Sequence, residues 1–301
     1  MECITRFEQM TAWLRSRPRR CRIAAVWPDD DHSLEALRRA LAEGMADVLL
    51  CGRAERYAAL SADFGPRAEC LSADTPVAAA RVATAAVRAG RADLIFKGLI
   101  ASDDLLRALL DKTGGLLPPG GVLAHVAAAE VPGRQKLLLL SDVAVIPQPT
   151  LEQRRAQVGY LAGVCRRLGT ERPRIALLHC TEKVSEKFPL TSDYRTLCRE
   201  ALDGRWGDME MEGPMDLTSA IRPQAAAVKQ LSHALGGEAD ALLMPDIEAG
   251  NVLYKALPLW CGARVAGMVM GAACPVVLTS RADTAQAKFD SLALAALTAA
   301  R

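Results

Sequence analysis

The chain has 301 residues, so one large domain or two moderate ones are expected. Hydrophobic residues make up 50% of it and charged residues 24%, a composition typical of a globular protein with a substantial core. The formal net charge of +2 and the dispersed arginines argue against binding to nucleic acid or to a membrane surface.

The nine cysteines are scattered, and none forms a C-x-x-C pair, which argues against a zinc or thioredoxin-type site. We therefore predict no bound metal, and reduced thiols as in a cytoplasmic protein. The first twenty residues lack the apolar core of a signal peptide, and no stretch holds the roughly 18 apolar residues of a membrane helix. His179 and Cys180 are adjacent on an expected strand, where neighbours point to opposite faces, so we expect no thiol–imidazole pair.

Strand-like apolar runs alternate with helical patterns along the whole chain. The expected strands are residues 22–27, 47–52, 93–98, 122–131, 136–142, 174–180, 208–216, 241–244, 265–270 and 275–280. The expected helices are residues 4–15, 33–44, 75–90, 101–115, 150–169, 191–204, 223–235 and 284–300, with one more after Asn251. Thr150 and Gln153 form a T-x-x-Q capping box. Ser102 or Asp103, and Thr191 or Ser192, are the expected caps of two further helices.

This alternation predicts an α/β fold, with two α/β domains and largely parallel sheets. Two clusters of proline and glycine bracket a strand around residues 120–132, and we place the domain boundary there. Residues 1–125 plus 280–301 are predicted to form the first domain, because the last helix has no sheet of its own. Residues 126–279 are predicted to form the second domain.

Polar turns follow several of the expected strands, at the end of an open α/β sheet where ligands usually bind. At residues 280–283, Ser280 and Arg281 precede a helix whose free N–H groups suit a phosphate. Arg281 adds a permanent, forked cation that matches phosphate oxygens. The structural alternative is that Asp283 or Thr284 caps the helix and Arg281 is merely solvated.

The turn at residues 245–251 is the second of these. Asp246 and Glu248 could act as a base and its orienting partner, or could be surface charges of a turn. Gly250 permits a close backbone approach, and Asn251 can cap the next helix.

Two more turns complete the set. Lys97 ends a strand, with Ser102 and Arg107 just beyond it, and Ser141 and Asp142 end another. Lys97 could contact an anion or simply be solvated. Together the four turns predict an α/β enzyme that handles a phosphate-bearing small molecule in a cleft.

The sequence resembles the phosphate acetyl/butyryltransferase family, and within it the phosphate butyryltransferase branch. The segments that carry the resemblance are ADALLMPDIEAGNVLYKAL and VAGMVMGAACPVVLTSRADTAQAKFDSLALA. Earlier segments follow the family in the same order, namely ADLIFKGLIASDDLLRALL, LLLSDVAVIPQPTLEQ, RIALLHCTEKVSEKFPLTSDY and EMEGPMDLTSAI. The resemblance covers nearly the whole chain and is weakest before about residue 90.

The resemblance implies a fold like that of isocitrate and isopropylmalate dehydrogenases, with an active-site cleft between the domains. It also implies a homodimer or higher homo-oligomer that pairs through the second domain. The implied reaction is reversible transfer of a short acyl group between coenzyme A and inorganic phosphate, and S-R-A-D at residues 280–283 favours a butyryl-like group over acetyl. Coenzyme A is then a substrate, and no cofactor is bound. In a ternary complex, the CoA thiolate attacks the carbonyl of the acyl phosphate.

The resemblance also implies residue roles. Ser280 hydrogen-bonds the reacting carbonyl or phosphate, and Arg281 binds phosphate and stabilises charge in the transition state. Arg107 matches a family arginine that holds an anionic group of the substrate or of CoA. The remaining substrate-binding candidates are Lys97, Ser102, Ser141, Asp142, Asp246, Gly250 and Asn251.

The chain departs from the family at the position of the base. Acetyl-specific relatives carry an aspartate seven residues after the serine of this motif, but here that position is Ala287, followed by Lys288. The candidates for the base are then Asp283, Asp246 and Asp142, of which we favour Asp283.

Two further departures remove polar groups, since Ala124 and Ile146 stand where relatives often carry serine and asparagine. They are typical of a more apolar acyl pocket, or of a catalytically weak or inactive paralogue that binds CoA or acyl phosphate. A decarboxylating dehydrogenase on a related fold is a third hypothesis. The lack of clustered metal-binding aspartates and of a nucleotide fingerprint argues against it.

Overall fold

The computed structural model describes residues 3–57, 64–224 and 235–300, and the chain forms two compact units. The first unit holds Phe7–Leu123 and Ala266–Arg301, and the second holds Met1–Arg6 and Ala124–Val265. The sequence-based division gave residues 266–279 to the second domain. They belong to the first unit because the short strand that they contain pairs with a strand of that unit.

The first unit is built on a mostly parallel sheet, which confirms the α/β prediction. Its strands, in spatial order, are β3 (Ala68–Ser72), β2 (Ala46–Gly52), β1 (Cys21–Val26), β4 (Leu94–Lys97), β11 (Val276–Val277) and β10 (Arg264–Met270). β11 is antiparallel to β10, and the other neighbours among these strands are parallel. Their apolar runs are buried, as expected for strands covered by helices on both faces. β3 was not expected from the sequence, because this edge strand is only partly buried and has no continuous apolar run.

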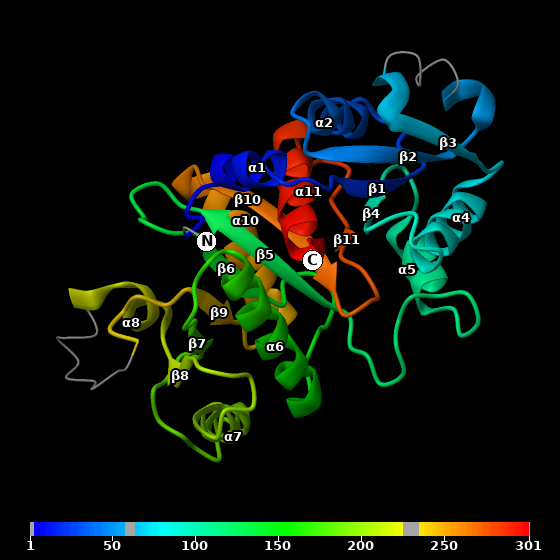
Figure 1. Cartoon of the computed structure of the whole chain (residues 1–301). Coiled ribbons are helices and arrows are strands. Elements are labelled where there is room, and N and C mark those ends of the chain that lie inside the picture. The colour runs from blue at the N-terminus through cyan, green and yellow to red at the C-terminus, as the bar shows by residue number, and fades with distance from the viewer. Residues whose placement is uncertain (1–2, 58–63, 225–234, 301) are drawn as a thin grey trace. The chain divides into compact units, whose positions relative to one another are not determined.

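Helices cover both faces of this sheet. They are α1 (Phe7–Arg15), α2 (Asp31–Ala42), α4 (Pro76–Arg88), α5 (Ser102–Leu110) and α11 (Ala285–Ala299). α2 and α11 contact each other. α4 connects β3 to the parallel strand β4, and because such connections are right-handed it covers the opposite face of the sheet. Figure 1 shows α11, in red, beside α1 and α2. Every residue of α11 from Lys288 to Leu297 is buried. The charged side chain of Lys288 therefore lies inside the protein.

The second unit contains five neighbouring strands, in the order β5-β6-β9-β7-β8. These strands are β5 (Ala124–Glu130), β6 (Leu138–Ser141), β9 (Ala241–Leu243), β7 (Arg174–Leu178) and β8 (Glu210–Met215). Only the β5–β6 pair is antiparallel among them. The helices of this unit are α6 (Leu151–Arg167), α7 (Leu190–Leu202), α8 (Leu217–Ile221) and α10 (Ile247–Cys261). A short 3-10 helix, η1 (Gly65–Arg67), belongs to the first unit.

The N-caps of the helices show which helix starts could be predicted from local sequence. The predicted capping box of α6 is confirmed, because Thr150 accepts a hydrogen bond from the N–H of Gln153 and the side chain of Gln153 accepts one from the N–H of Thr150. The expected cap of α5 was wrong: Ala101 occupies the N-cap and makes no side-chain hydrogen bond.

The expected cap of α7 was also wrong. Pro189 occupies the N-cap, and the hydroxyl of the buried Thr191 donates to the carbonyl of Phe188 at 2.7 Å instead of capping the helix. Of the helix expected at residues 223–235, residues 225–234 lie outside the described part of the chain.

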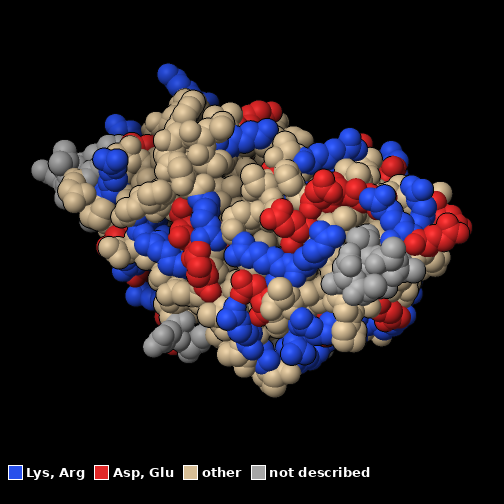
Figure 2. Space-filling view, turned by 90° about the horizontal axis from the view of Figure 1, so that it is seen from above, with Lys and Arg blue, Asp and Glu red and all other residues tan. Residues whose placement is uncertain are grey.

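None of the described helices combines the length and apolar character that crossing a bilayer requires. Within the same part of the chain, no group of three or more His, Cys, Asp or Glu side chains is arranged to hold a metal ion. On the face shown in Figure 2, lysines and arginines are interspersed with aspartates and glutamates.

Candidate active site

The carboxyl ends of three strands of the first unit meet at one edge of its sheet. β1 and β4 are parallel, with Val26 opposite Lys97, and β4 and β11 are also parallel. The chain leaves β1 towards the start of α2 and leaves β11 through residues 280–283 towards the start of α11. Residues from three distant stretches are thereby brought to the edge at which α/β proteins bind ligands.

The turn at residues 280–283 is held by its own hydrogen bonds. The carboxylate of Asp283 accepts the N–H of Ser280 at 2.8 Å, and the hydroxyl oxygen of Ser280 accepts the N–H of Ala282 at 3.3 Å. Thr284, rather than Asp283, caps α11, with its hydroxyl accepting from Ala287. Asp283 therefore shapes the turn, and the exposed side chains of Ser280 and Arg281 stand at its tip.

Arg281 is available to a ligand. Its side chain makes no hydrogen bond or ion pair with the other described residues, and it is exposed. A guanidinium placed at the end of a strand and just before a helix N-terminus is suited to bidentate contact with phosphate oxygens.

Lys288, which was given no role from the sequence, contacts the same turn. It is 2% exposed, and its ammonium donates to the hydroxyl of Thr279 at 3.3 Å and to the carbonyl of Ser280 at 3.4 Å. It also lies 3.9 Å from the carboxylate of Asp30, the N-cap of α2. Lys288 thus ties the turn after β11 to the start of α2. The sequence feature that could have pointed to Lys288 is a lysine in the first turns of an otherwise apolar helix.

Lys97 completes a group of three cations with Arg281 and Lys288. It is 4% exposed, and burial lowers its pKa, with the neighbouring charges of Lys288 and Arg281 lowering the pKa further. The carboxylates of Asp30 and Asp283 oppose this effect in part. A region where cations outnumber carboxylates, beside two helix N-termini, favours a multiply charged anion such as a phosphoryl group.

The backbone that follows Lys97 lies unusually close to the backbone at the end of β1. A β-carbon on Gly98 would lie 2.3 Å from the carbonyl oxygen of Trp27, so only glycine allows the ends of β4 and β1 to approach this closely. Trp27 itself has φ 51°, in the left-handed region that a bulky residue rarely adopts. A strained residue beside a cluster of charges is typical of a functional site.

Arg107 lies in a groove between α4 and α5. The groove has a volume of ≈ 670 Å³, and its basic lining residues are Arg81, Arg88 and Arg107. Arg107 pairs with Asp104 at 2.7 Å but keeps 75% of its side chain exposed. Ser102, also predicted as a ligand residue, occupies the first turn of α5. Asp104 and Asp111 also line the groove, so its charge is mixed, and a role of Arg107 in binding substrate stays a prediction.

The predicted residues of the second unit hold a turn together. Asp142 is 1% exposed, and its carboxylate accepts the N–H groups of His125, Ala144 and Val145 at 2.8–3.0 Å. Ser141, just before it, is fully buried. This saturation explains the position of Asp142 without any ligand.

The start of α10 is fixed to the same turn. Asp246 is the N-cap of α10 and accepts the N–H of Ala249 at 2.8 Å. The amide of Asn251 donates to the carbonyl of Val143 at 3.0 Å. A β-carbon on Gly250 would lie 2.2 Å from the carbonyl oxygen of Asp142. The expectation that Asn251 caps the next helix was wrong, because α10 already begins at Ile247 and Asp246 is its N-cap. A role of these residues in binding substrate stays a prediction.

His179 and Cys180 correct another expectation. The sulfur of Cys180 lies 3.6 Å from Nδ1 of His179, although we expected them to point apart. β7 ends at Leu178, so the alternation of side chains along a strand does not apply to this pair.

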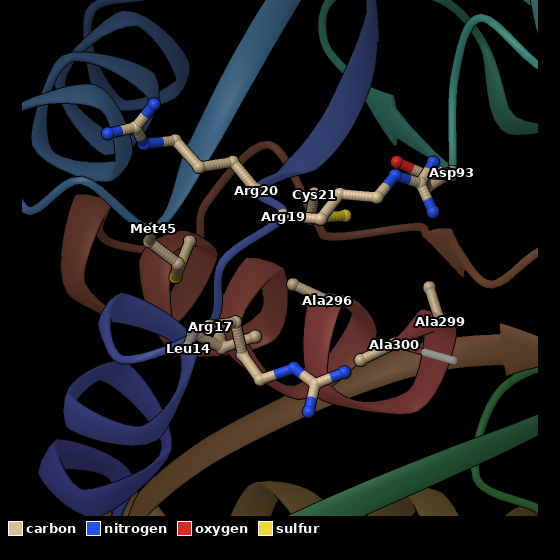
Figure 3. Close-up of a pocket in the computed structure, with 10 residues that line it drawn as sticks. All are labelled: Leu14, Arg17, Arg19, Arg20, Cys21, Met45, Asp93, Ala296, Ala299 and Ala300. Carbon is tan, nitrogen blue, oxygen red and sulfur yellow. Dashed lines mark hydrogen bonds and ion pairs between the residues drawn. The ribbon is translucent and has the colours of Figure 1, made fainter.

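A small cavity of ≈ 40 Å³ lies at the opposite, amino end of β1 and is drawn in Figure 3. Ala296, Ala299 and Ala300 line it from the end of α11. The guanidinium of Arg19 extends to Asp93, 2.6 Å away, rather than into the cavity. A cavity of this size holds only a few water molecules, since each needs about 10–15 Å³, so it is too small for a substrate of this kind.

The model of the family described as "Phosphate acetyl/butaryl transferase" matches residues 71–296. The chain belongs to this family. It is 33% identical to a phosphate acetyltransferase of Thermotoga maritima over 296 residues, which cover 96% of this chain and 98% of the relative. It is 34% identical to a phosphate butyryltransferase of Clostridium acetobutylicum over 281 residues, 92% of this chain and 93% of the relative.

The same relationship appears in three dimensions. The crystal structure of a branched-chain phosphotransacylase from Enterococcus faecalis matches with a TM-score of 0.81 and 29% identity, covering 93% of this chain and 99% of that one. The family members are acyltransferases, so this chain is an enzyme of the phosphate acyltransferase type. The narrower likeness to isocitrate and isopropylmalate dehydrogenases stays a prediction.

Proposed function

We propose that this enzyme transfers a short, butyryl-like acyl group reversibly between coenzyme A and inorganic phosphate, through a ternary complex. The observation that carries the proposal is the cluster at one sheet edge, where the exposed, unpaired Arg281 lies beside the buried cations Lys97 and Lys288. Coenzyme A acts as a substrate, and no bound cofactor is required. Ala124 and Ile146, both buried, support an apolar acyl pocket.

In the direction of CoA acylation, the phosphoryl group of the acyl phosphate binds at Arg281 and the start of α11. The CoA thiolate attacks the carbonyl carbon, and negative charge develops on the carbonyl oxygen. In this proposal the hydroxyl of Ser280, whose oxygen accepts the N–H of Ala282, donates a hydrogen bond to that oxygen or to the phosphate. Arg281 stabilises the charge that builds on the departing phosphate.

The test is release of free thiol from butyryl-CoA and acetyl-CoA in the presence of phosphate. We expect phosphate-dependent release, with a higher kcat/KM for butyryl-CoA. Absence of release with every short acyl-CoA refutes the catalytic claim. Calorimetry then examines the alternative, an inactive paralogue that binds CoA or acyl phosphate, which the alanine at position 287 favours. Binding of CoA without turnover supports that alternative.

The groove at Arg107 gives a separate prediction about the binding of CoA. Replacing Arg107 by alanine removes an exposed cation that we propose binds CoA and takes no part in the chemical step, so KM for CoA should rise roughly 10-fold with little change in kcat. Steady-state kinetics at fixed acyl phosphate measures both. Arg6→Ala, on the other unit, is the charge-matched control. A large fall in kcat with unchanged KM contradicts this role.

We also propose a homo-oligomer that pairs through the second unit. α10 exposes large apolar side chains to solvent, with Val252 65%, Leu259 77% and Trp260 83% exposed. An unpaired apolar helix face of this kind is typical of an interface between subunits. Trp260→Glu should convert the oligomer into a monomer in light scattering, whereas Val77→Glu on the first unit should not. A wild-type monomer, or an oligomer unaffected by Trp260→Glu, rules this interface out.

A cytoplasmic location remains part of the proposal. The nine cysteines, all within the described residues, are free thiols, as expected in a reducing compartment.

A further inference from the structure

The carboxylates considered as the base already hold the backbone of their own turns. Asp283 accepts the N–H of Ser280, and the first turn of α11 contains no acidic residue. Asp246 caps α10, and Asp142 accepts three N–H groups. Taking up a proton would remove the negative charge that strengthens these hydrogen bonds. The proposed reaction still needs a group that takes the proton from the thiol of CoA, because the thiol itself is a poor nucleophile.

A histidine reaches the turn at residues 280–283 from a distant part of the chain. His32 is the second residue of α2, and its Nδ1 lies 3.1 Å from the backbone carbonyl oxygen of Asp283. The packing of α2 against α11 brings together these two residues, which are 251 positions apart in the sequence. The side chain of His32 is exposed, so a ligand bound at this turn can reach it.

The contact with Asp283 determines which ring nitrogen of His32 carries a hydrogen. A backbone carbonyl can only accept a hydrogen bond, so Nδ1 is the donor. In the neutral ring the other nitrogen, Nε2, then carries no hydrogen and has a lone pair available. Nε2 makes no hydrogen bond with any other residue that the structure describes. One nitrogen therefore fixes the ring, and the other is open to a substrate.

His32 and the proposed phosphate site share this short turn. Arg281 stands at its tip, two residues before Asp283, whose carbonyl holds the imidazole. In an acyl phosphate, the carbon that the thiol attacks is one oxygen atom away from the phosphorus. A phosphoryl group bound to Arg281 therefore brings the reacting carbon, and the thiol that approaches it, close to the turn that His32 contacts.

The imidazole is suited to carry a proton from the thiol to the phosphate. Histidine takes up and releases a proton near neutral pH. An acceptor on Nδ1 holds the ring in one orientation and also stabilises the imidazolium that forms when Nε2 is protonated. The carbonyl of Asp283 is such an acceptor, and it serves both states of the ring without any rotation of the side chain.

We propose that Nε2 of His32 takes the proton from the thiol of coenzyme A. The inference rests on the proposed function. As the S–H bond breaks, a new N–H bond forms on Nε2, and the sulfur bonds to the acyl carbon. The bond from that carbon to the phosphate oxygen then breaks, its electron pair stays with the oxygen, and the imidazolium gives its proton to the departing phosphate. His32 is left neutral, and no other reactant is consumed.

His32→Asn separates the proton acceptor from the hydrogen bond to the turn. The asparagine amide can still donate to the carbonyl of Asp283, but it cannot take up a proton. We expect kcat to fall roughly 100-fold or more, while the midpoint of thermal unfolding stays that of the wild type. Imidazole in the buffer should restore part of the activity of His32→Ala and none of that of Arg281→Ala. Wild-type-like turnover of His32→Asn shows that His32 only supports the turn, and overturns the proposal.

The tautomer of His32 can be measured without substrate. In nitrogen-15 NMR of the histidine-labelled enzyme, the signals of His32 are assigned by their loss in His32→Asn. At a pH where the ring is neutral, they should show a hydrogen on Nδ1 and none on Nε2. A hydrogen on Nε2 overturns the proposal, whether or not the enzyme turns over. Lack of turnover in the wild type instead refutes the proposed function, and the role of His32 as base with it.

Discussion

Replacing Arg281 by alanine is expected to lower kcat/KM by roughly 100- to 1000-fold, the usual effect of losing one donor to a transition state. The side chain is exposed and makes no hydrogen bond or ion pair with the other described residues, so the fold loses nothing when it is removed. Its contribution arises only when a phosphoryl group is present. Steady-state kinetics with butyryl-CoA and phosphate measures the loss, and thermal unfolding checks the fold.

Two variants make the Arg281 experiment specific. Arg281→Lys keeps the positive charge but not the planar guanidinium that donates two parallel hydrogen bonds. This variant should therefore be more active than Arg281→Ala but less active than the wild type. Arg20→Ala removes another exposed arginine, at the opposite end of the strands, and should be indistinguishable from wild type. Unchanged turnover of Arg281→Ala refutes a role for this residue in the reaction.

Gly250→Ala is expected to destabilise the protein by about 3 kcal/mol. Helix propensity alone predicts the opposite sign, because alanine is favoured over glycine within a helix by about 1 kcal/mol. The contact decides the outcome: the new β-carbon would lie 2.2 Å from the carbonyl oxygen of Asp142, a backbone atom that cannot move without disturbing the turn it belongs to. The midpoint of urea unfolding should fall accordingly.

Gly163 provides the matched control for Gly250. It also lies within a helix, α6, but a β-carbon there would meet nothing within 4 Å. Gly163→Ala should therefore leave stability unchanged or raise it by about 0.5–1 kcal/mol. If Gly250→Ala is as stable as Gly163→Ala, then α10 does not pack as closely against the turn at residues 142–145 as described here.

Local patterns predicted the features that depend on neighbours in sequence. Apart from the edge strand β3, the strands of the first unit were recognisable as apolar runs, and the capping box at Thr150 and Gln153 was recognisable from its spacing. β11 is different: two residues, Val276 and Val277, define it, and only their pairing with β4 places residues 266–279 in the first unit. Pairing with a strand some 180 residues away leaves no local trace.

The candidate site was predictable only in part, for the same reason. Ser280, Arg281 and Lys97 were found because each follows a strand. Lys288 was missed as a site residue because its contacts with Thr279 and Asp30 depend on α11 packing against α2. Asp142 shows the opposite difficulty, since a carboxylate at a strand end can be held by N–H groups of its own turn, and its role in binding substrate stays a prediction.

The most direct test of the proposed activity is phosphorus NMR of the purified enzyme with butyryl-CoA and inorganic phosphate. The proposed reaction predicts that the phosphate signal declines as an acyl phosphate signal appears, with one equivalent of free CoA released for each. It also predicts no such change for Arg281→Ala on the same timescale. If CoA is released while no acyl phosphate forms, the enzyme is a hydrolase and the proposed transfer to phosphate is wrong.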